Sequence, residues 1–322
     1  MDLEKAGIER LREAAQISEA YYDKPLMICY SGGKDSEVIL NLALKSGIKF
    51  ELQHSHTTVD APETVYYIRK RFKELEASGV TCTINMPRYK GKPTSMWSLI
   101  VAKKIPPTRL IRYCCAVLKE TAGRNRAIAT GVRRAESVKR KSRGLVETYT
   151  NNPSKRIILN NDNDDKRQIV EHCQLQGKII INPICDWSNE DVKDYINQEH
   201  IELNPLYQCG FNRVGCIGCP IAGKKRNKEF VNFPQYKKLY IKSFDKMLLA
   251  RKQDGLIANT WQSGLDVYHW WMEDGVLPGQ LSIDDENDRL LSEHIGINFT
   301  NNEDYDEREA RAKELNSKRR KR

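Results

Sequence analysis

The sequence predicts an α/β protein in which a parallel sheet carries helices on both faces, followed by a smaller, mainly helical region that contains cysteines. Up to about residue 200, short apolar runs alternate with stretches of helical periodicity, the pattern of a parallel sheet with crossover helices. From Ile201 onward this alternation stops, and cysteine, glycine, lysine and aromatic residues dominate. A chain of 322 residues can form one large domain with an appendage.

The individual elements follow from these patterns. Apolar residues at helical spacing predict helices, the third with proline in its first turn, at residues 3–20, Glu37–Lys45 and Pro62–Leu75. Short apolar runs predict strands at Leu26–Tyr30, Phe50–His54, Val80–Asn85, Arg126–Gly131 and Lys178–Pro183. The polar stretch Asn151–Gln168 predicts a long loop or insertion. Ser188, followed by Glu190 and Asp191, is typical of a helix N-cap with acids in the first turn.

We therefore divide the chain into an N-terminal helix (1–23), a sheet domain (24–200), a cysteine-containing basic and aromatic region (201–300) and a charged tail (301–322). The formal net charge of +10 favours a polyanionic partner such as DNA or RNA. Neither a run of 18 apolar residues nor a signal-peptide layout occurs, so we expect a cytoplasmic protein without membrane contact. The oligomeric state is not predicted.

The segment Ser31–Ser36, with sequence SGGKDS, follows the first expected strand and opens a helix. Gly32 and Gly33 let the backbone approach a ligand closely, and the helix N-terminus directs amide N–H groups toward an anion. Lys34 adds a positive charge for phosphate, Ser31 and Ser36 offer hydroxyls, and Asp35 is suited to Mg²⁺. This pattern predicts a nucleotide phosphate site, with Lys34 and Asp35 as catalytic candidates; it is not the Walker A spacing.

Four further residues are candidates for the same site. Gly131 ends the expected strand Arg126–Gly131. Arg133 and Arg134 follow it, where guanidinium groups can bind phosphate; a solvated charge patch is the alternative. Arg133 is also a catalytic candidate. Asp60 follows the second strand and is a candidate Mg²⁺ ligand, with a loop or capping role as the alternative.

The nine cysteines include Cys209, Cys216 and Cys219, followed by proline. An odd number argues against a disulfide framework, and the Cys-x-x-Cys pair with adjacent glycines is typical of a metal or cluster site. A fourth thiolate can come from Cys114 or Cys115. Four sulfur ligands suit a 4Fe–4S cluster or zinc; we expect the cluster and keep zinc as the alternative.

Taken together, these segments resemble the PP-loop ATP pyrophosphatases, or adenine nucleotide alpha-hydrolase-like proteins, and within them the phosphoadenosine phosphosulfate (PAPS) reductase family. The resemblance covers roughly residues 24–220. Besides the SGGKDS loop it rests on His56–Asp60 with Pro62-Glu63-Thr64, on Arg112–Lys119, on Gly131–Ser137 and on Asn182–Ser188. It implies a Rossmann-like sheet and favours Cys114 over Cys115 as the fourth ligand, because Cys114 matches the family's cysteine position.

The resemblance by parts is strongest to the iron–sulfur members of this family in DNA phosphorothioation systems. It implies an enzyme that cleaves ATP, with Mg²⁺, to AMP and pyrophosphate and so activates an acceptor, DNA in particular, for sulfur transfer. A cysteine desulfurase or another sulfur-donor protein would then be a partner. The reductases use a late cysteine nucleophile, and no cysteine follows Cys219. A sulfonucleotide reductase is therefore the first alternative, and a nucleic-acid-binding regulator that senses a nucleotide is the second.

Basic and aromatic residues are mixed after the cysteines, from Lys224 to Tyr240. Such a mixture can follow a phosphate backbone and stack on bases. The alternative is a helix whose aromatic residues belong to the core and whose lysines are solvated. The basic end of the chain, Lys318–Arg322, adds electrostatic attraction for a polyanion.

Overall fold

The computed structural model describes residues 2–121, 123, 125–136, 140–141, 143–149, 158–159, 178–256 and 261–273. The predicted tail 301–322 and most of the predicted insertion lie outside these residues. The chain divides into two compact units, 1–268 and 269–322, and the boundary expected at residue 200 falls within the first. Within the described residues, no helix has the length and apolar character needed to cross a membrane.

Seven strands of the described chain form one sheet, in the order β3-β2-β1-β6-β9-β7-β8. Their bounds are β1 Leu26–Cys29, β2 Phe50–Ser55, β3 Thr81–Asn85, β6 Arg126–Ala129, β7 Val146–Tyr149, β8 Ile158–Leu159 and β9 Lys178–Ile181, with a separate hairpin of β4 Arg88–Tyr89 and β5 Lys92–Pro93. The first five members of this order pair in parallel, and they are the five predicted strands. The predicted fold class is therefore confirmed.

The far edge of the sheet departs from the prediction. β7 runs antiparallel to β9, and β8 runs antiparallel to β7. The loop interpretation of Asn151–Gln168 was wrong for β8, because a two-residue strand leaves too short an apolar run to be recognised in a polar stretch. β7 and β8 thus extend the parallel sheet by an antiparallel edge.

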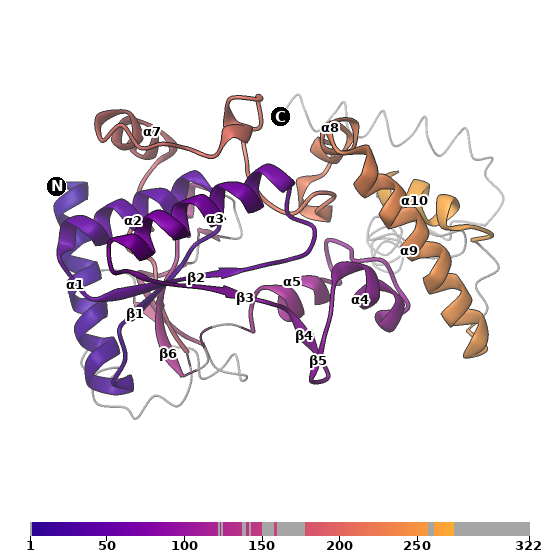
Figure 1. The fold of residues 1–322 in the computed structure, drawn as a ribbon, viewed down its shortest axis with the longest axis horizontal. Coiled ribbons are helices and arrows are strands. Elements are labelled where there is room, and N and C mark those ends of the chain that lie inside the picture. Colours follow the sequence, from indigo (N-terminus) through magenta and orange to yellow (C-terminus); the bar gives the residue numbers. More distant parts are fainter. Residues whose placement is uncertain are drawn as a thin grey trace, which may run out of the picture. The chain divides into compact units, whose positions relative to one another are not determined.

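The described helices and the shorter 3₁₀ turns complete the fold (Figure 1). The helices are α1 Leu3–Tyr22, α2 Lys34–Ser46, α3 Pro62–Ala77, α4 Met96–Lys103, α5 Tyr113–Leu118, α7 Asn189–Gln198, α8 Lys225–Asn232, α9 Pro234–Gln253 and α10 Gly264–Glu273. The 3₁₀ turns are η1 Arg134–Glu136, η4 Pro205–Tyr207 and η5 Pro220–Ala222. The cap predicted for α7 is confirmed: the Ser188 hydroxyl accepts from the Asp191 amide at 3.0 Å, and the Asp191 carboxylate accepts from the Ser188 amide at 2.7 Å.

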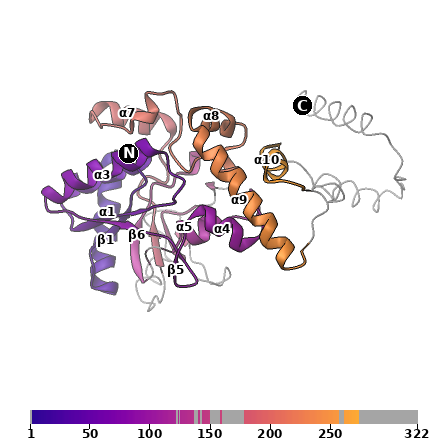
Figure 2. The ribbon, with the colours of Figure 1, turned by 45° about the vertical axis from the view of Figure 1, so that its right-hand side comes forward.

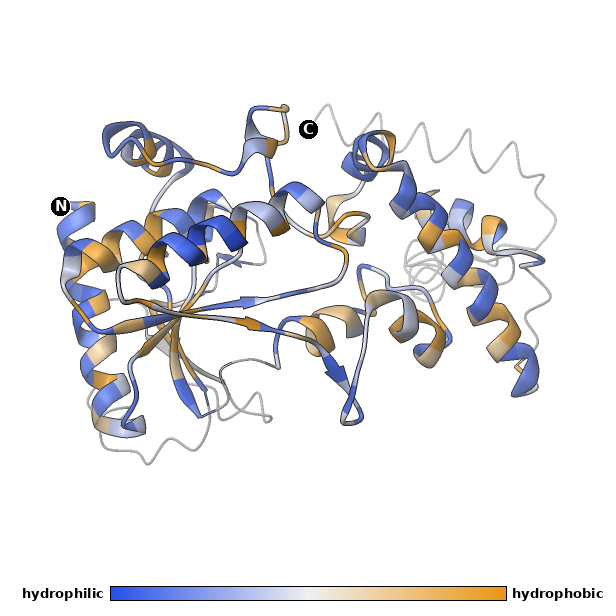
Figure 3. Cartoon of the chain, in the orientation of Figure 1, coloured by the Kyte–Doolittle hydropathy of each residue, from blue (hydrophilic) through white to orange (hydrophobic). Residues whose placement is uncertain are grey.

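The hydrophobic core lies between the sheet and its helices, and Figure 3 shows apolar residues along β1 and on the helices that pack around it. Leu26 and Ile28 of β1, and Leu40 and Leu42 of α2, are at most 1% exposed. Helix α1 is held to the chain after β9 by Arg10, whose guanidinium donates to both carboxylate oxygens of Asp186 at 2.8 and 2.9 Å. This bidentate pair fixes the N-terminal helix against the core.

Helices α8 and α9 form a second, aromatic packing region, and α4 lies beside α9 (Figure 2). The rings of Trp97 and Tyr240 are 5.0 Å apart, and those of Phe230 and Tyr240 are 5.8 Å apart. Phe230, Phe233 and Tyr240 are all at most 5% exposed. The packing interpretation of these aromatic residues therefore fits the structure, and they are not a platform on which bases could stack.

Candidate phosphate loop and thiol group

The loop Ser31–Ser36 connects β1 to α2 and is closed by its own hydrogen bonds. The Ser36 hydroxyl accepts from the Ser31 amide at 3.3 Å and donates to the Gly33 carbonyl at 2.7 Å. Gly32 has φ +69°, and a Cβ there would lie 2.9 Å from the side chain of Ile68. Only glycine fits this position without strain, because any side chain would combine a positive φ with a close contact to Ile68.

The loop lies where the strand order of the sheet reverses. From β1 the chain adds β2 and β3 on one side, whereas β6 and β9 follow on the other. Gly131, just after β6, contacts the loop from the neighbouring strand: a Cβ on Gly131 would be 3.1 Å from the Cβ of Asp35. Ligands of open α/β sheets bind in the crevice at this reversal, beyond the carboxyl ends of the strands.

Arg133 is 1% exposed and surrounded by acceptors of the protein itself. Its Nε donates to Asp35 Oδ1 at 2.7 Å, one terminal nitrogen donates to the Ser188 carbonyl at 3.0 Å, and the other donates to Asn189 Oδ1 at 3.1 Å. With its donors used in this way, Arg133 holds Asp35 in place rather than reaching outward for a phosphate. The catalytic role assigned from sequence stays a prediction, and the contacts favour a positioning role.

Arg134 and Asp60 are also engaged with the protein. Arg134 Nε donates to the Arg143 carbonyl at 2.9 Å. Asp60 is 7% exposed, accepts from the Thr57 amide at 2.8 Å, and pairs through its backbone with Cys216. The structure thus links Asp60 to the cysteine-containing loop, and its predicted role as a magnesium ligand stays a prediction.

Several arginines that were not assigned to the site lie near one another, and one of them, Arg140, lies near Asp35. The pKa of Arg140 is lowered, first by burial and then by the charges of Arg143, Arg213 and Arg112, while Asp35 opposes the shift. Gathering like charges costs free energy that a bound polyanion would recover. Arg213 lies between Cys209 and Cys216 in sequence, and this proximity to the cysteine motif is the one signal that could have identified it.

Tyr207, at the end of η4, is another residue that the sequence did not reveal. Its hydroxyl accepts a hydrogen bond from the Lys34 amide at 3.0 Å. The turn η4 therefore packs directly on the loop Ser31–Ser36, which we call the phosphate loop. It joins the sheet domain to the loop carrying Cys216 and Cys219.

Four thiols lie close to one another. Cys114 and Cys115 are on α5, and Cys216 and Cys219 are on the loop before η5. The pKa of Cys114 is raised by its hydrogen bond with Cys115, by burial, and by the nearby thiols Cys115, Cys216 and Cys219. Cys209 is exposed on the turn after η4. The structure thus gathers both cysteines that the sequence treated as alternatives, and it leaves Cys209 at the surface.

Among these thiols, Cys115 is the one whose surroundings lower the pKa and favour the thiolate form. A terminal nitrogen of Arg112 donates to its sulfur at 3.2 Å. The hydrogen bond with Cys114 lowers the pKa of Cys115, burial opposes this, and Arg112 and Lys119 lower it further. Such a thiolate is both a nucleophile and a metal ligand.

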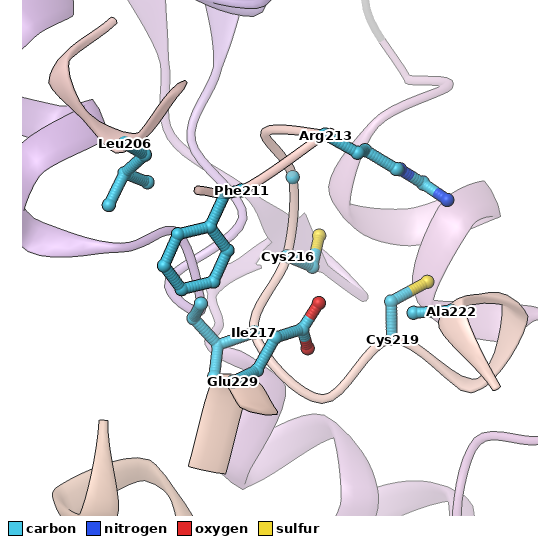
Figure 4. A pocket seen from close by; sticks show the side chains of 9 residues that line it. Leu206, Phe211, Arg213, Cys216, Ile217, Cys219, Ala222 and Glu229 are labelled. Carbon is cyan, nitrogen blue, oxygen red and sulfur yellow. The ribbon is translucent and has the colours of Figure 1, made fainter. Parts of the chain in front are cut away.

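A small pocket adjoins these thiols (Figure 4). Cys216 and Cys219 line it together with Arg213 and Glu229, which Figure 4 shows around the same loop. The Glu229 carboxylate accepts from the Gly218 amide at 2.7 Å, and burial raises its pKa. Glu229 thereby fixes the turn between the two cysteines.

The donor set fits an iron–sulfur cluster. Lys119 and Arg112 lie near the four thiols. Their positive charges can offset the negative charge of the thiolates and of a bound cluster. In the described chain, no three of these sulfurs lie within 4.8 Å of one another. A tetrahedral zinc ion would hold its sulfurs about 3.8 Å apart, given a Zn–S bond of about 2.3 Å. The four thiols suit either group, and the preference for a cluster over zinc stays a prediction.

Fold and site together define a nucleotide-binding α/β protein with its phosphate loop at the reversal of strand order. Residues 25–222 match the family described as phosphoadenosine phosphosulfate reductase domain. Since this match covers more than half of the chain, the protein belongs to that family, as the sequence motifs predicted. The narrower closeness to phosphorothioation proteins is not confirmed.

Several known proteins are similar to parts of the chain. An uncharacterised protein of Methanocaldococcus jannaschii is 29% identical over 265 residues, which are 78% of this chain and 55% of that protein. Adenosine 5'-phosphosulfate reductase of Streptomyces coelicolor is 34% identical over 111 residues, 33% of this chain and 37% of that enzyme. The solved PAPS reductase of Candida auris is 20% identical with a TM-score of 0.42, covering 65% of this chain and 87% of that one. The chain spans about half the length, or less, of these two curated relatives.

Proposed function

We propose that the protein is an ATP pyrophosphatase that adenylates an acceptor for sulfur transfer. The acceptor oxygen attacks the α-phosphorus of ATP, the bond to the bridging oxygen of the β-phosphate breaks, and pyrophosphate leaves with Mg²⁺. A sulfide-level sulfur nucleophile then attacks the activated atom of the acceptor, so that a bond to sulfur forms, the bond to the AMP oxygen breaks and AMP leaves. Where the donor supplies a persulfide, a dithiol reductant cleaves the remaining sulfur–sulfur bond. The observation that carries the proposal is the loop Ser31–Ser36 at the strand-order reversal, with arginines and thiols gathered nearby.

Each part of the site has a role in this reaction. The amides of the loop and Lys34 bind phosphate oxygens, and Asp35, oriented by Arg133, positions Mg²⁺. Arg140 and Arg213 offset charge that develops on the pyrophosphate. Cys114, Cys115, Cys216 and Cys219 would hold a 4Fe–4S cluster, which would supply a binding site for the sulfur to be transferred.

The acceptor is proposed to be nucleic acid, DNA in particular. The net charge of +10 favours a polyanion. Lys224, Lys225 and Lys228 lie in and next to the first turn of α8. This helix follows the loop that carries Cys216 and Cys219, called the thiol loop below. A cysteine desulfurase or another sulfur-donor protein would load the site. We place the reaction in the cytoplasm, where thiols stay reduced.

The test measures AMP and pyrophosphate released from ATP and Mg²⁺, with and without DNA. The wild-type protein should release equal amounts of both, and Lys34→Ala should lower the rate at least 100-fold, because the charge stabilises the transition state. Lys49→Ala, at an exposed position on the same unit, is the matched control and should keep the wild-type rate. Absence of both products under every condition would refute the proposal.

A sulfonucleotide reductase is the second candidate, favoured by the Arg112–Cys115 contact of 3.2 Å. The Cys115 thiolate would attack the sulfonate sulfur, form a cysteine S-sulfonate and release the nucleotide. A dithiol such as thioredoxin would then release sulfite and become a disulfide. Sulfite from PAPS or adenosine phosphosulfate, lost in Cys115→Ser, would support this candidate. Tight DNA binding without turnover of ATP or a sulfonucleotide would instead indicate a regulator.

A further inference from the structure

Three metal-binding side chains meet at the carboxyl end of β2, apart from the thiol donors. Ligand atoms of His54, His56 and Asp60 lie within 4.8 Å of one another. His54 is in β2 itself, whereas His56 and Asp60 belong to the turn that follows. The strand and this short turn therefore bring two imidazoles and a carboxylate to one point.

His54 is prepared as a ligand by its surroundings. It is 6% exposed, and its Nδ1 donates to the Tyr30 carbonyl at 3.0 Å. In the neutral ring this bond leaves the lone pair on Nε2, which is buried and has no hydrogen-bond partner among the described residues. An unsatisfied buried polar atom costs about 1–3 kcal/mol. Ligating histidines commonly donate their other nitrogen to a backbone carbonyl in this way.

Asp60 and His56 complete the donor set. The Asp60 carboxylate is 7% exposed and fixed by the Thr57 amide at 2.8 Å. Its Oδ2 is 3.5 Å from Nδ1 of His56. The side chain of His56 is 23% exposed and leaves an entry path from solvent. Burial favours the neutral form of His54 by lowering its pKa, which keeps the lone pair free for an ion.

We propose that His54 Nε2, a ring nitrogen of His56 and the Asp60 carboxylate bind one divalent first-row transition-metal ion. Two imidazoles and one carboxylate suit Zn²⁺, Fe²⁺ or Co²⁺, whereas Mg²⁺ prefers oxygen ligands alone. The ion sits beside the thiol loop, because Asp60 pairs with Cys216 and the Cys216 sulfur donates to the Thr57 hydroxyl at 3.4 Å. The bound ion fixes the turn after β2 against the loop that carries Cys216. Since the protein supplies three ligands, further coordination positions of the ion stay open.

The test titrates chelator-treated, tag-free full-length protein with Co²⁺ and Zn²⁺ and measures affinity by calorimetry and bound metal by elemental analysis. All variants carry Cys216→Ser, which weakens the thiol site. We expect one ion per chain, affinity at least 10-fold lower in His54→Gln and in Asp60→Asn, and no change in the matched control His200→Gln, an exposed histidine. The Co²⁺ spectrum should lack thiolate charge-transfer bands.

Three results would overturn the proposal, the third from a parallel titration with Mg²⁺. The first is unchanged affinity in both His54→Gln and the more exposed His56→Gln, a variant chosen because it should fold even if the buried one does not. The second is loss of the ion in Cys216→Ser with the histidines intact, which would assign it to the thiols. Equal affinity for Mg²⁺ and Zn²⁺ would likewise contradict a site built from imidazoles. ATP cleavage is not measured in this experiment, so its outcome is separate from that of the proposed function.

Discussion

Nε of Arg133 donates to Oδ1 of Asp35 across 2.7 Å and joins the end of β6 to the phosphate loop after β1. The two residues are 98 positions apart in sequence. Because Arg133 is buried and Asp35 is partly exposed, the arginine fixes the carboxylate from behind and leaves it open on its solvent side. The geometry of the loop therefore depends on the neighbouring strand.

Arg133→Met should destabilise the fold by about 3 kcal/mol, because it leaves Asp35 and several carbonyls without their buried donor. Urea denaturation measures this change. Arg88→Met, on an exposed hairpin, should alter the free energy of unfolding by less than about 0.5 kcal/mol. Equal stability of the two variants would show that the Arg133 contacts do not support the loop.

Gly32→Ala should destabilise the protein more than Gly47→Ala and should also weaken ATP binding. Gly32 and Gly47 have positive φ angles of +69° and +71°. Alanine should therefore cause the same backbone strain, about 1 kcal/mol, at both positions. Only Gly32 meets a neighbour, Ile68 at 2.9 Å, which adds about 1–3 kcal/mol of overpacking. Thermal unfolding and nucleotide titration would measure the two effects, and identical behaviour would contradict the crowding at the loop.

The Arg10–Asp186 pair should make stability depend on pH in the acid range. Burial tends to raise the pKa of Asp186, but the hydrogen bonds and charge of Arg10 outweigh it, so the pKa is lowered. The folded state then binds fewer protons than the unfolded state. The stabilisation is present above the unfolded pKa of about 3.9 and is lost as the pH falls through the folded pKa.

The variant Asp186→Asn tests the predicted direction of this pH dependence of stability. At pH 7 the variant should be less stable by about 1–2 kcal/mol, since it removes a charge-assisted bond. The difference from wild type should shrink as the pH falls below about 4. Denaturation at a series of pH values provides the measurement, and a difference that grows with acidity would show the opposite sign.

The arrangement of thiols predicts which cysteines matter for iron binding. Cys216→Ser and Cys115→Ser should lower the iron content and visible absorption of anaerobically purified protein, whereas exposed Cys209→Ser should retain both. Cys29→Ala is the control, because burial in β1 raises the pKa of Cys29 to about 11 and keeps it a thiol. If only Cys209→Ser lost iron, Cys209 would be a ligand, as the sequence predicted, and the ligand set based on the structure would be wrong.

Local features of the fold were predictable from sequence because their causes lie within a few residues. An apolar run, two glycines and a helix start are contiguous at residues 26–46, so strand, loop and helix were all anticipated. The helices α4 and α5 were not, because each is short and lies between segments without clear periodicity. The antiparallel edge was missed for the same reason at β8.

The sequence by itself determined the strand, loop and helix around Ser31–Ser36, the five parallel strands and membership of the family, since these depend on neighbouring residues and their spacing. Only the tertiary structure decided which side chains meet. It buried Arg133 behind Asp35 and brought Cys114 and Cys115 to Cys216 and Cys219. Such contacts join segments through packing of separate elements, and no local pattern in the chain records them.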